Sequence, residues 1–297
     1  MASSLLAVPE DVDDLILAYC KNNPRIEPPA VVRDIARIVC IAHLVQNGTL
    51  DGRNAVLSGG MAMRCLSSPR LSIWDGDTSA RRAPDLDVLR DAISYEDDDI
   101  AITPAPTRSW ETGYRLVTAQ PITYEPFFTR LDAGQAEFSL TVSHRGIAMK
   151  TERHLLRTGY PFPILAEELE VPIMNPDEIL AEKTVAWWLF GHAKHYNDIA
   201  FLLTRMVFDD RRDEDASVRS KIRRTIERKI EVNKALHKNR IKALTVAERR
   251  RRLEDPNSFV DERRTFNSLS YLDGTPPNLA LLRRQVSRYG LPLLFDE

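Results

Sequence analysis

The sequence predicts an α+β fold in which short helices precede a small mixed sheet and a large helical lobe follows it. Three observations support this prediction. Hydrophobic residues recur at helical spacing over 10–22 and 29–47, short apolar runs separated by turns fill residues 55–152, and helical patterns dominate after residue 175. The 297 residues suggest two domains at roughly 100–200 residues each, and we place them at 1–174 and 175–297.

The composition excludes several classes of protein. With 43% hydrophobic and 28% charged residues, the chain is neither disordered nor fibrous. No apolar run approaches the roughly 20 residues of a membrane-spanning helix, and acidic residues interrupt the first 20 positions, unlike a secretory signal. Three cysteines without a Cys-x-x-Cys pair support neither a disulfide framework nor a zinc ribbon. We therefore expect a cytoplasmic protein.

A glycine turn follows the first predicted strand. The apolar run 55–57 ends at Ser58-Gly59-Gly60, and residues 61–66 favour a helix. A glycine pair between a strand and a helix leaves backbone N–H groups exposed, as in sites that bind phosphate. The sequence therefore predicts a phosphate cradle here, and a plain tight turn is the alternative.

Paired acids follow this turn. Residues 67–84 are typical of a loop, whereas the sequence Asp85-Leu86-Asp87-Val88-Leu89 predicts a strand. In a strand, residues i and i+2 point to the same side, so Asp85 and Asp87 would project together and suit Mg²⁺. Asp75-Gly76-Asp77 is the competing pair, which we disfavour because Gly76 favours a turn.

Further strands are predicted between residues 98 and 150. The clearest lie over 136–144 and 146–152, on either side of Arg145-Gly146. The second of these strands leads to Glu152, an acid at its end.

Helices dominate the C-terminal half. Asn175-Pro176-Asp177-Glu178 predicts a helix start, with Asn as the cap, Pro at the first helical position and Glu at the third. Helices are then predicted at about 176–190, 194–206, 216–237, 245–254, 258–271 and 277–288.

The net charge of −2 conceals an asymmetry between regions. Residues 205–264 hold 19 Lys/Arg against 12 Asp/Glu, and residues 219–252 hold 14 against three. Val218, Ile222, Ile226 and Ile230 recur every four residues, which predicts one buried stripe with basic residues on the other faces. We predict that the basic helices 219–252 contact an RNA backbone, and a solvated surface helix is the alternative.

Three motifs together resemble the DNA polymerase beta-like nucleotidyltransferase superfamily and, more narrowly, the AbiEii/AbiGii toxin family. The stretch Gly59–Arg64 stands where that family has a Gly-Gly-Thr-Ala-Leu-like turn, and Arg81–Val88 stands for its Arg-x-Ser-x-Asp-Leu-Asp motif. Glu178–Lys183 matches its Glu-Ile-Leu-Ala-Glu-Lys helix, and His195–Ile199 matches the Lys/Arg-Asp-Leu segment that follows.

The chain departs from the family pattern at several positions. Ser58 stands where a Lys is usual, and Ala83 replaces the Ser of the second motif. Asn197 and Phe201 replace an Arg and an Asp of the last motif, and about ten extra residues separate the glycine pair from Asp85.

The resemblance implies a Mg²⁺-dependent enzyme that transfers a nucleoside monophosphate from an NTP to an acceptor. It implies the toxin of a bacterial toxin–antitoxin or phage-defence pair, with a cognate antitoxin protein as partner. By the same resemblance, Asp85 and Asp87 would hold the metal, while the phosphate contacts would come from Ser58, Gly59, Gly60 and Arg64.

The resemblance also implies roles for three further residues. Lys183 would neutralise the triphosphate as a point charge, and Asp198 would pair with Lys183 or orient it. Glu152 is our candidate for the third carboxylate, which completes the metal site or accepts the proton of the attacking hydroxyl. An exposed acid at a strand end is the alternative for Glu152.

The expected acceptor is RNA, especially the 3′ end of tRNA, because the basic helices favour a polyanion. A protein hydroxyl or a small molecule such as an aminoglycoside is the alternative acceptor. A degenerate nucleotide- or RNA-binding protein without catalytic activity is the alternative of another class.

Overall fold

The computed structural model describes residues 5–68, 75–82, 85–96, 100–104, 108–111, 116–125, 136–143, 147–208, 216–262, 265, 269 and 278–295. The chain divides into two compact units. The N-terminal unit is Met1–Met174, and the C-terminal unit is Asn175–Leu269 with Thr275–Glu297. Within the described ranges, no helix is long and apolar enough to cross a membrane.

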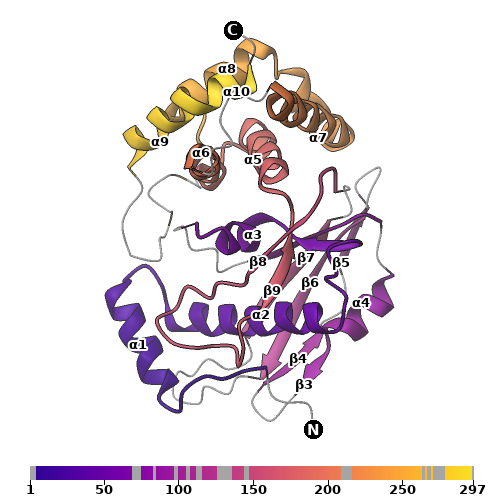
Figure 1. Ribbon diagram of the computed structural model, residues 1–297, viewed down its shortest axis with the longest axis vertical. Coiled ribbons are helices and arrows are strands. Elements are labelled where there is room, and N and C mark those ends of the chain that lie inside the picture. The colour runs from indigo at the N-terminus through magenta and orange to yellow at the C-terminus, as the bar shows by residue number, and fades with distance from the viewer. Residues whose placement is uncertain are drawn as a thin grey trace. The chain divides into compact units, whose positions relative to one another are not determined.

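The N-terminal unit is built on one mixed sheet (Figure 1). Across the described part of the sheet the strand order is β3-β4-β6-β7-β2-β1-β9-β8, and β5 pairs with β6. The strands are β1 (Ala55–Leu57), β2 (Asp75–Ala80), β3 (Tyr95–Glu96), β4 (Ala101–Pro104), β5 (Arg108–Glu111), β6 (Leu116–Glu125), β7 (Ala136–Ser143), β8 (Glu152–Leu155) and β9 (Glu170–Ile173). Strand β2 is central, because it pairs antiparallel with β1 and parallel with β7.

Four helices accompany this sheet in the described residues: α1 (Val12–Asn22), α2 (Pro28–Gln46), α3 (Gly59–Cys65) and α4 (Leu86–Ile93). Helix α2 crosses one face of the sheet, where it packs against β7 and α4 (Figure 1). Its apolar residues, such as Ile35 and Ile38, are fully buried. The α+β class and the helix predicted over 29–47 are therefore confirmed.

Two predictions between residues 67 and 89 are wrong. Residues 75–80 form the central strand β2 although Asp and Gly have low strand propensity, because pairing on both sides overrides local preference. The predicted strand 85–89 is instead the start of helix α4. The carboxylate of Asp85 accepts hydrogen bonds from the N–H groups of Asp87 and Val88, which is how an aspartate caps a helix.

The two strands predicted around residue 145 have different outcomes. The strand over 136–144 is confirmed as β7. The strand over 146–152 is wrong where the structure describes it, because residues 147–151 are outside regular structure and β8 begins at Glu152.

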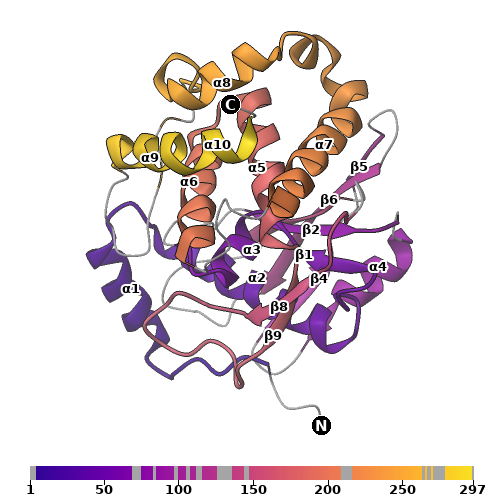
Figure 2. The same cartoon turned by 45° about the horizontal axis from the view of Figure 1, so that its top comes forward.

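The C-terminal unit is helical in its described residues. Helix α5 lies between α6 and α7 (Figures 1 and 2). The elements are α5 (Pro176–Phe190), α6 (Ala193–Phe208), α7 (Ala216–Lys242), α8 (Val246–Glu254), η1 (Pro256–Ser258), α9 (Leu279–Gln285), η3 (Val286–Gly290) and α10 (Leu291–Leu294). The predicted cap of α5 is confirmed, because Asn175 Oδ1 accepts a hydrogen bond from the Asp177 N–H at 3.0 Å. The helix predicted over 258–271 is wrong at residues 259–262, which are not helical.

Helix α7 packs against α5 through an apolar stripe and a buried ion-pair cluster. Ile222, Ile226 and Ile230 are buried, as their spacing predicts, whereas Val218 of the predicted stripe is only half-buried. On the same side, Lys229 Nζ lies 2.8 Å from Glu178 Oε1 and 2.6 Å from Glu182 Oε1, both on α5. Burial alone would lower the pKa of Lys229, but the two glutamates outweigh burial and raise this pKa.

This cluster predicts a large cost for the substitution Lys229→Met. The change leaves the fully buried carboxylate of Glu178 without its cation, so we expect the free energy of unfolding to fall by about 3–5 kcal/mol. Urea denaturation at neutral pH measures the effect. Lys221→Met, at an exposed position of the same helix, is the control and should change stability by less than about 0.5 kcal/mol. Equal effects of the two substitutions would contradict the buried cluster.

Candidate active site

The glycine turn between β1 and α3 has a backbone that requires glycine. Gly59 has a φ of +55°, in the left-handed region that residues with a Cβ rarely adopt. A Cβ at Gly59 would also lie 1.9 Å from Asp77 Oδ2, which is far inside contact distance. Gly59 is therefore required both by its own backbone and by the carboxylate beside it.

Asp77 on β2 lies beside this turn. The antiparallel pairing of β1 with β2 sets Leu57 opposite Thr78, and the Ser58 N–H donates to the Asp77 carbonyl at 2.9 Å. The Gly60 N–H points to Asp77 Oδ2 at 3.4 Å. Strand pairing thus places a half-buried carboxylate directly over the glycine turn.

A second acidic position shares this strand. Asp75 lies two residues before Asp77, and positions i and i+2 of a strand belong to the same face of a sheet. The parallel strand β7 pairs Ser139 with Asp75 and Thr141 with Asp77. Glu137 stands two positions before Ser139 on β7.

This set of acids has the chemistry that Mg²⁺ prefers. Magnesium is bound through one or two carboxylates together with waters and substrate phosphates. Asp77 offers such a carboxylate beside the backbone N–H of Gly60, and Asp75 stands two positions before it on the same strand. Among the side chains that the structure describes, no group of three or more His, Cys, Asp and Glu is arranged to hold a metal.

The structure does not bring Asp85 and Asp87 to the glycine turn. Ala80, at the end of β2, pairs with Ala55 at the start of β1, so the chain after Ala80 leaves the β1–β2 pair at the end opposite Gly59. Asp85 caps α4, and the side chain of Asp87 is 91% exposed and lies 3.6 Å from Arg90. The predicted projection of both carboxylates from one strand face is therefore wrong.

Glu152 is also separated from this turn. Its strand β8 is the outermost, and β9 and β1 lie between it and β2, a span of about 14 Å at the usual strand spacing. Across the sheet, Glu152 pairs with Ile173, Ile173 with Leu57, and Leu57 with Thr78. Thr78 follows Asp77 in β2 and points to the opposite face, so this row of residues faces away from Asp77. The carboxylate of Glu152 instead contacts His154 Nε2 at 3.1 Å.

Arg64, predicted at the phosphates, belongs to a buried cluster in the N-terminal unit. Its side chain is only 2% exposed, and Nη1 pairs with Asp34 Oδ2 at 2.6 Å. The Tyr160 hydroxyl donates to the same oxygen at 2.6 Å, and Asp34 also pairs with Arg37. Burial alone would raise the pKa of Asp34, but Arg64 and Arg37 outweigh burial and lower this pKa. The guanidinium of Arg64 therefore anchors α3 to the core.

The predicted pairing of Lys183 with Asp198 is present in the C-terminal unit. Lys183 Nζ on α5 lies 2.8 Å from Asp198 Oδ2 on α6, and both residues are buried. His195, one turn before Asp198, has a pKa held well below its usual value by burial and by the charges of Lys183 and Lys194. The imidazole of His195 is consequently neutral at pH 7. Lys183 therefore has the Asp198 carboxylate beside it and no positive charge from the His195 ring.

A sequence signal for Asp75 and Asp77 exists. Arg70-Leu71-Ser72 precedes Asp75 and supplies the Arg-x-Ser of the family motif with one extra residue, whereas Arg81-Arg82-Ala83 lacks the serine. Residues 69–74 lie outside the described residues, so this signal rests on sequence alone.

The contact of Asp77 with the turn can be tested with two glycines. Gly59→Ala and Gly48→Ala both place a Cβ at positive φ, but no atom lies within 4 Å of a Cβ at Gly48. Gly48→Ala should cost about 1–2 kcal/mol of stability, and Gly59→Ala should cost clearly more because Asp77 must also move. Urea denaturation of both variants gives the difference. Equal costs would show that the Asp77 carboxylate does not lie over the turn.

Comparisons with known proteins identify the fold and the family of this chain. The chain matches MenT4, a nucleotidyltransferase toxin from Mycobacterium tuberculosis H37Rv, with a TM-score of 0.62 and 17% identity over 94% of this chain and 89% of that one, which supports a shared fold. JHP933 from Helicobacter pylori matches at 12% identity over 95% of this chain and 93% of that one, with a lower TM-score of 0.42. No curated protein matches. The model of the nucleotidyl transferase AbiEii toxin family, a type IV toxin–antitoxin system, matches residues 48–277. The chain therefore belongs to the AbiEii family of nucleotidyltransferase toxins.

Proposed function

We propose that this toxin transfers a nucleoside monophosphate from an NTP to RNA in a Mg²⁺-dependent reaction that releases pyrophosphate. The observation that carries the proposal is the Asp77 carboxylate over the Gly59-Gly60 turn. This arrangement combines an acid suited to a metal with backbone N–H groups suited to phosphate. Family membership supplies the reaction class.

We assign the metal to Asp77 and Asp75, with Glu137 on the neighbouring strand β7 as the third acid in place of Glu152. Mg²⁺, when bound, offsets the charge of the triphosphate and of the attacking oxygen. The pairing of β1 with β2 places Asp77 beside the turn before any nucleotide binds.

The phosphates would be held by the turn and by one lysine. The backbone N–H groups of Gly59 and Gly60 would serve as donors. Ser58 would contribute its hydroxyl, because its own N–H already donates to the Asp77 carbonyl. Lys183 would supply a point charge, which suits a phosphate without demanding a fixed geometry. Its ion pair with the buried Asp198 limits the rotamers of the lysine and so orients the ammonium.

Fewer basic residues are available to contact RNA than the composition suggests. Arg249 pairs with Glu227, and Arg250 pairs with Glu254. Arg251 and Arg252 both bind Glu248, and their hydrogen bonds lower the pKa of that carboxyl to about 2. The guanidinium of Arg223 donates to the carbonyls of Leu293, Pro292 and Phe295 at the end of α10. Arg223 and Arg249 thus join neighbouring elements of the C-terminal unit, whereas Arg250 and Arg251 pair within α8 and remain partly exposed.

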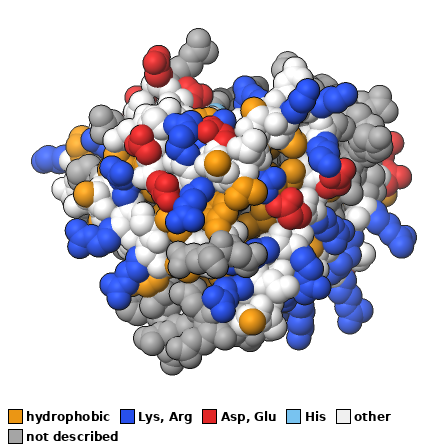
Figure 3. Space-filling view, turned by 90° about the horizontal axis from the view of Figure 1, so that it is seen from above, with side chains coloured by type: hydrophobic (Ala, Val, Ile, Leu, Met, Phe, Trp, Pro, Cys, Tyr) orange, Lys and Arg blue, Asp and Glu red, His pale blue; other side chains and the backbone are white. Residues whose placement is uncertain are grey.

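One face of α7 keeps exposed cations. Lys221, Arg224 and Arg228 are exposed and recur at three- or four-residue spacing, on the side away from the buried isoleucines. Lys238 and Lys242 are also exposed, but they follow the break in helical geometry at His237. Figure 3 shows Lys and Arg side chains gathered toward the right-hand edge of that view, with acidic side chains interspersed elsewhere. We propose that this face contacts the phosphate backbone of RNA, and that the acceptor is the 3′ end of tRNA.

Two other functions remain as outcomes of the tests below. One is transfer to a hydroxyl of a protein or small molecule, and the other is nucleotide binding without transfer. The toxin family also implies a cognate antitoxin protein as a partner of this chain.

Asp77→Asn should reduce the transfer of labelled NMP to total RNA by at least about 10³-fold, because it removes a metal-binding charge from the reaction centre. Asp85→Asn and Asp87→Asn are matched controls on an exposed helix start and should retain near-normal transfer. The measurement is a gel of RNA and protein fractions with each labelled NTP and Mg²⁺. Loss of transfer in the controls but not in Asp77→Asn would contradict the assignment. Label on protein alone would exclude RNA as the acceptor, and NTP binding without any transfer would favour a binding protein.

Charge reversal of Lys221, Arg224 and Arg228 together should weaken RNA binding by about tenfold or more. It should also make the affinity less dependent on salt, because a protein that makes fewer phosphate contacts releases fewer counterions on binding. Binding measured at several salt concentrations tests both effects. The control reverses three exposed basic residues of the N-terminal unit, Lys21, Arg153 and Arg157, and should have a smaller effect. Unchanged affinity in the α7 variant would make this face a solvated surface.

A further inference from the structure

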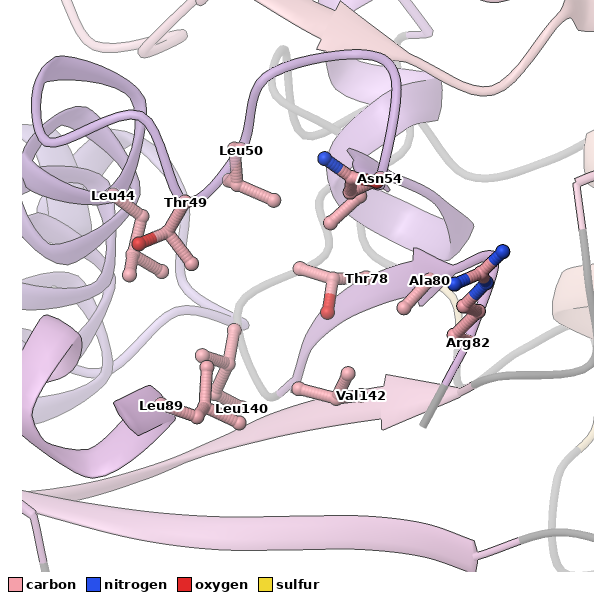
Figure 4. A pocket seen from close by; sticks show the side chains of 11 residues that line it. Leu44, Thr49, Leu50, Asn54, Thr78, Ala80, Arg82, Leu89, Leu140 and Val142 are labelled. Atoms are coloured by element: carbon pink, nitrogen blue, oxygen red, sulfur yellow. The ribbon is translucent and has the colours of Figure 1, made fainter. Parts of the chain in front are cut away.

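The N-terminal unit contains an apolar cavity that the proposed function does not use. Its volume is about 200 Å³ (Figure 4). Described residues from α2, the loop after it, β1, β2, α4 and β7 line it, and the apolar ones include Leu44, Leu50, Leu89, Leu140 and Val142. Figure 4 shows these side chains arranged around a common space.

This cavity lies on the face of the sheet opposite Asp77. Thr78, next to Asp77 in β2, lines the cavity together with Ala80 and Ala55, which are paired across β1 and β2. Successive residues of a strand point to opposite faces, so a molecule in the cavity would not touch the Asp77 carboxylate. The cavity is therefore a separate site.

Two arginines beside the cavity differ in their partners. Arg81 Nε donates to the Arg53 carbonyl at 2.6 Å, and its Nη1 donates to the Ile147 carbonyl at 3.3 Å. Arg82 lines the cavity and is exposed, and within the part of the chain that the structure describes it makes no hydrogen bond or ion pair. In Figure 4 its guanidinium lies at the same end of the cavity as Asn54.

The other polar groups of the cavity are partly used. The Thr78 hydroxyl donates to the Thr141 carbonyl at 3.2 Å, and Asn54 Nδ2 donates to Asp51 Oδ2 at 2.7 Å. Arg82 is accordingly the charged group of the lining that is ready to bind a ligand, and it attracts an anion.

We propose that this cavity binds a small carboxylate with an apolar body, whose anionic end faces Arg82. Unfilled apolar volume is destabilising, and a cavity of about 150 Å³ in another protein takes up benzene, so about 200 Å³ holds a body of roughly six to ten non-hydrogen atoms. The apolar lining matches that body, and Arg82 at one end matches the carboxylate. Ligand sites of this type combine a mostly apolar wall with a few polar groups that fix orientation.

Calorimetric titration of the full chain with hexanoate, hexan-1-ol and benzene tests the proposal. Hexanoate should bind with one-to-one stoichiometry and at least about tenfold more tightly than hexan-1-ol, because of the charge-assisted hydrogen bond. Arg82→Gln should remove that difference and leave the affinity for hexan-1-ol unchanged. Ala80→Leu, which fills the cavity from β2, should abolish binding of all three probes.

A second cavity-filling variant separates loss of binding caused by a filled cavity from loss caused by misfolding. Thr49→Phe fills the cavity from a loop, and circular dichroism checks that each variant retains its helices and strands. Unchanged hexanoate binding in a folded filling variant would overturn the proposal. Equal binding of hexanoate and hexan-1-ol, with no effect of Arg82→Gln, would overturn it too, because the cavity would then be a packing void open to any apolar molecule.

Discussion

The contact between the Asp77 carboxylate and the Gly59-Gly60 turn is the interaction on which the candidate site depends. Gly59 tolerates both a positive φ and an acid 1.9 Å from where its Cβ would be. The pairing of β2 with β1 and β7 fixes the register that brings Asp77 there. The glycine at position 76, between the two acids, is explained by close packing, because a Cβ there would lie 3.1 Å from Leu140 Cδ1 and 3.4 Å from Arg37 Cδ. A small residue lets α2 and β7 approach the strand from the face opposite the acids.

Buried charge supports this arrangement from within the core. Asp34 on α2 binds Arg37 of its own helix and Arg64 of α3, and the Tyr160 hydroxyl donates to the same carboxylate. Removing one partner of such a cluster leaves another charge buried, so the cluster ties the helix of the glycine turn to α2. Arg64, which follows the glycine motif, therefore stabilises the core instead of contacting phosphate directly.

Local chemistry was sufficient to predict some elements from the sequence, and non-local pairing explains where prediction failed. The Asn175 cap depends on neighbouring residues only, and the glycine pair of the Ser58-Gly59-Gly60 turn is visible in the local sequence; both are present. Asp85-Leu86-Asp87 has apolar neighbours that suit a strand or a helix, and a hydrogen bond to its own backbone decides for the helix. Strand β2 has weak propensity of its own and forms because β1 and β7 flank it. Charge counts likewise identified a basic region. They could not show that Arg223 and Arg249–Arg252 have partners within the protein.

Metal binding tests the central claim most directly, because it does not depend on the acceptor. Mn²⁺, in place of Mg²⁺, can be titrated into the protein with a non-hydrolysable NTP analogue and followed by electron paramagnetic resonance. We expect Asp77→Asn to lose nucleotide-dependent Mn²⁺ binding and Asp85→Asn to bind Mn²⁺ as the unaltered protein does. Binding that is kept by Asp77→Asn and lost by Asp85→Asn would contradict the assignment of the metal to Asp77.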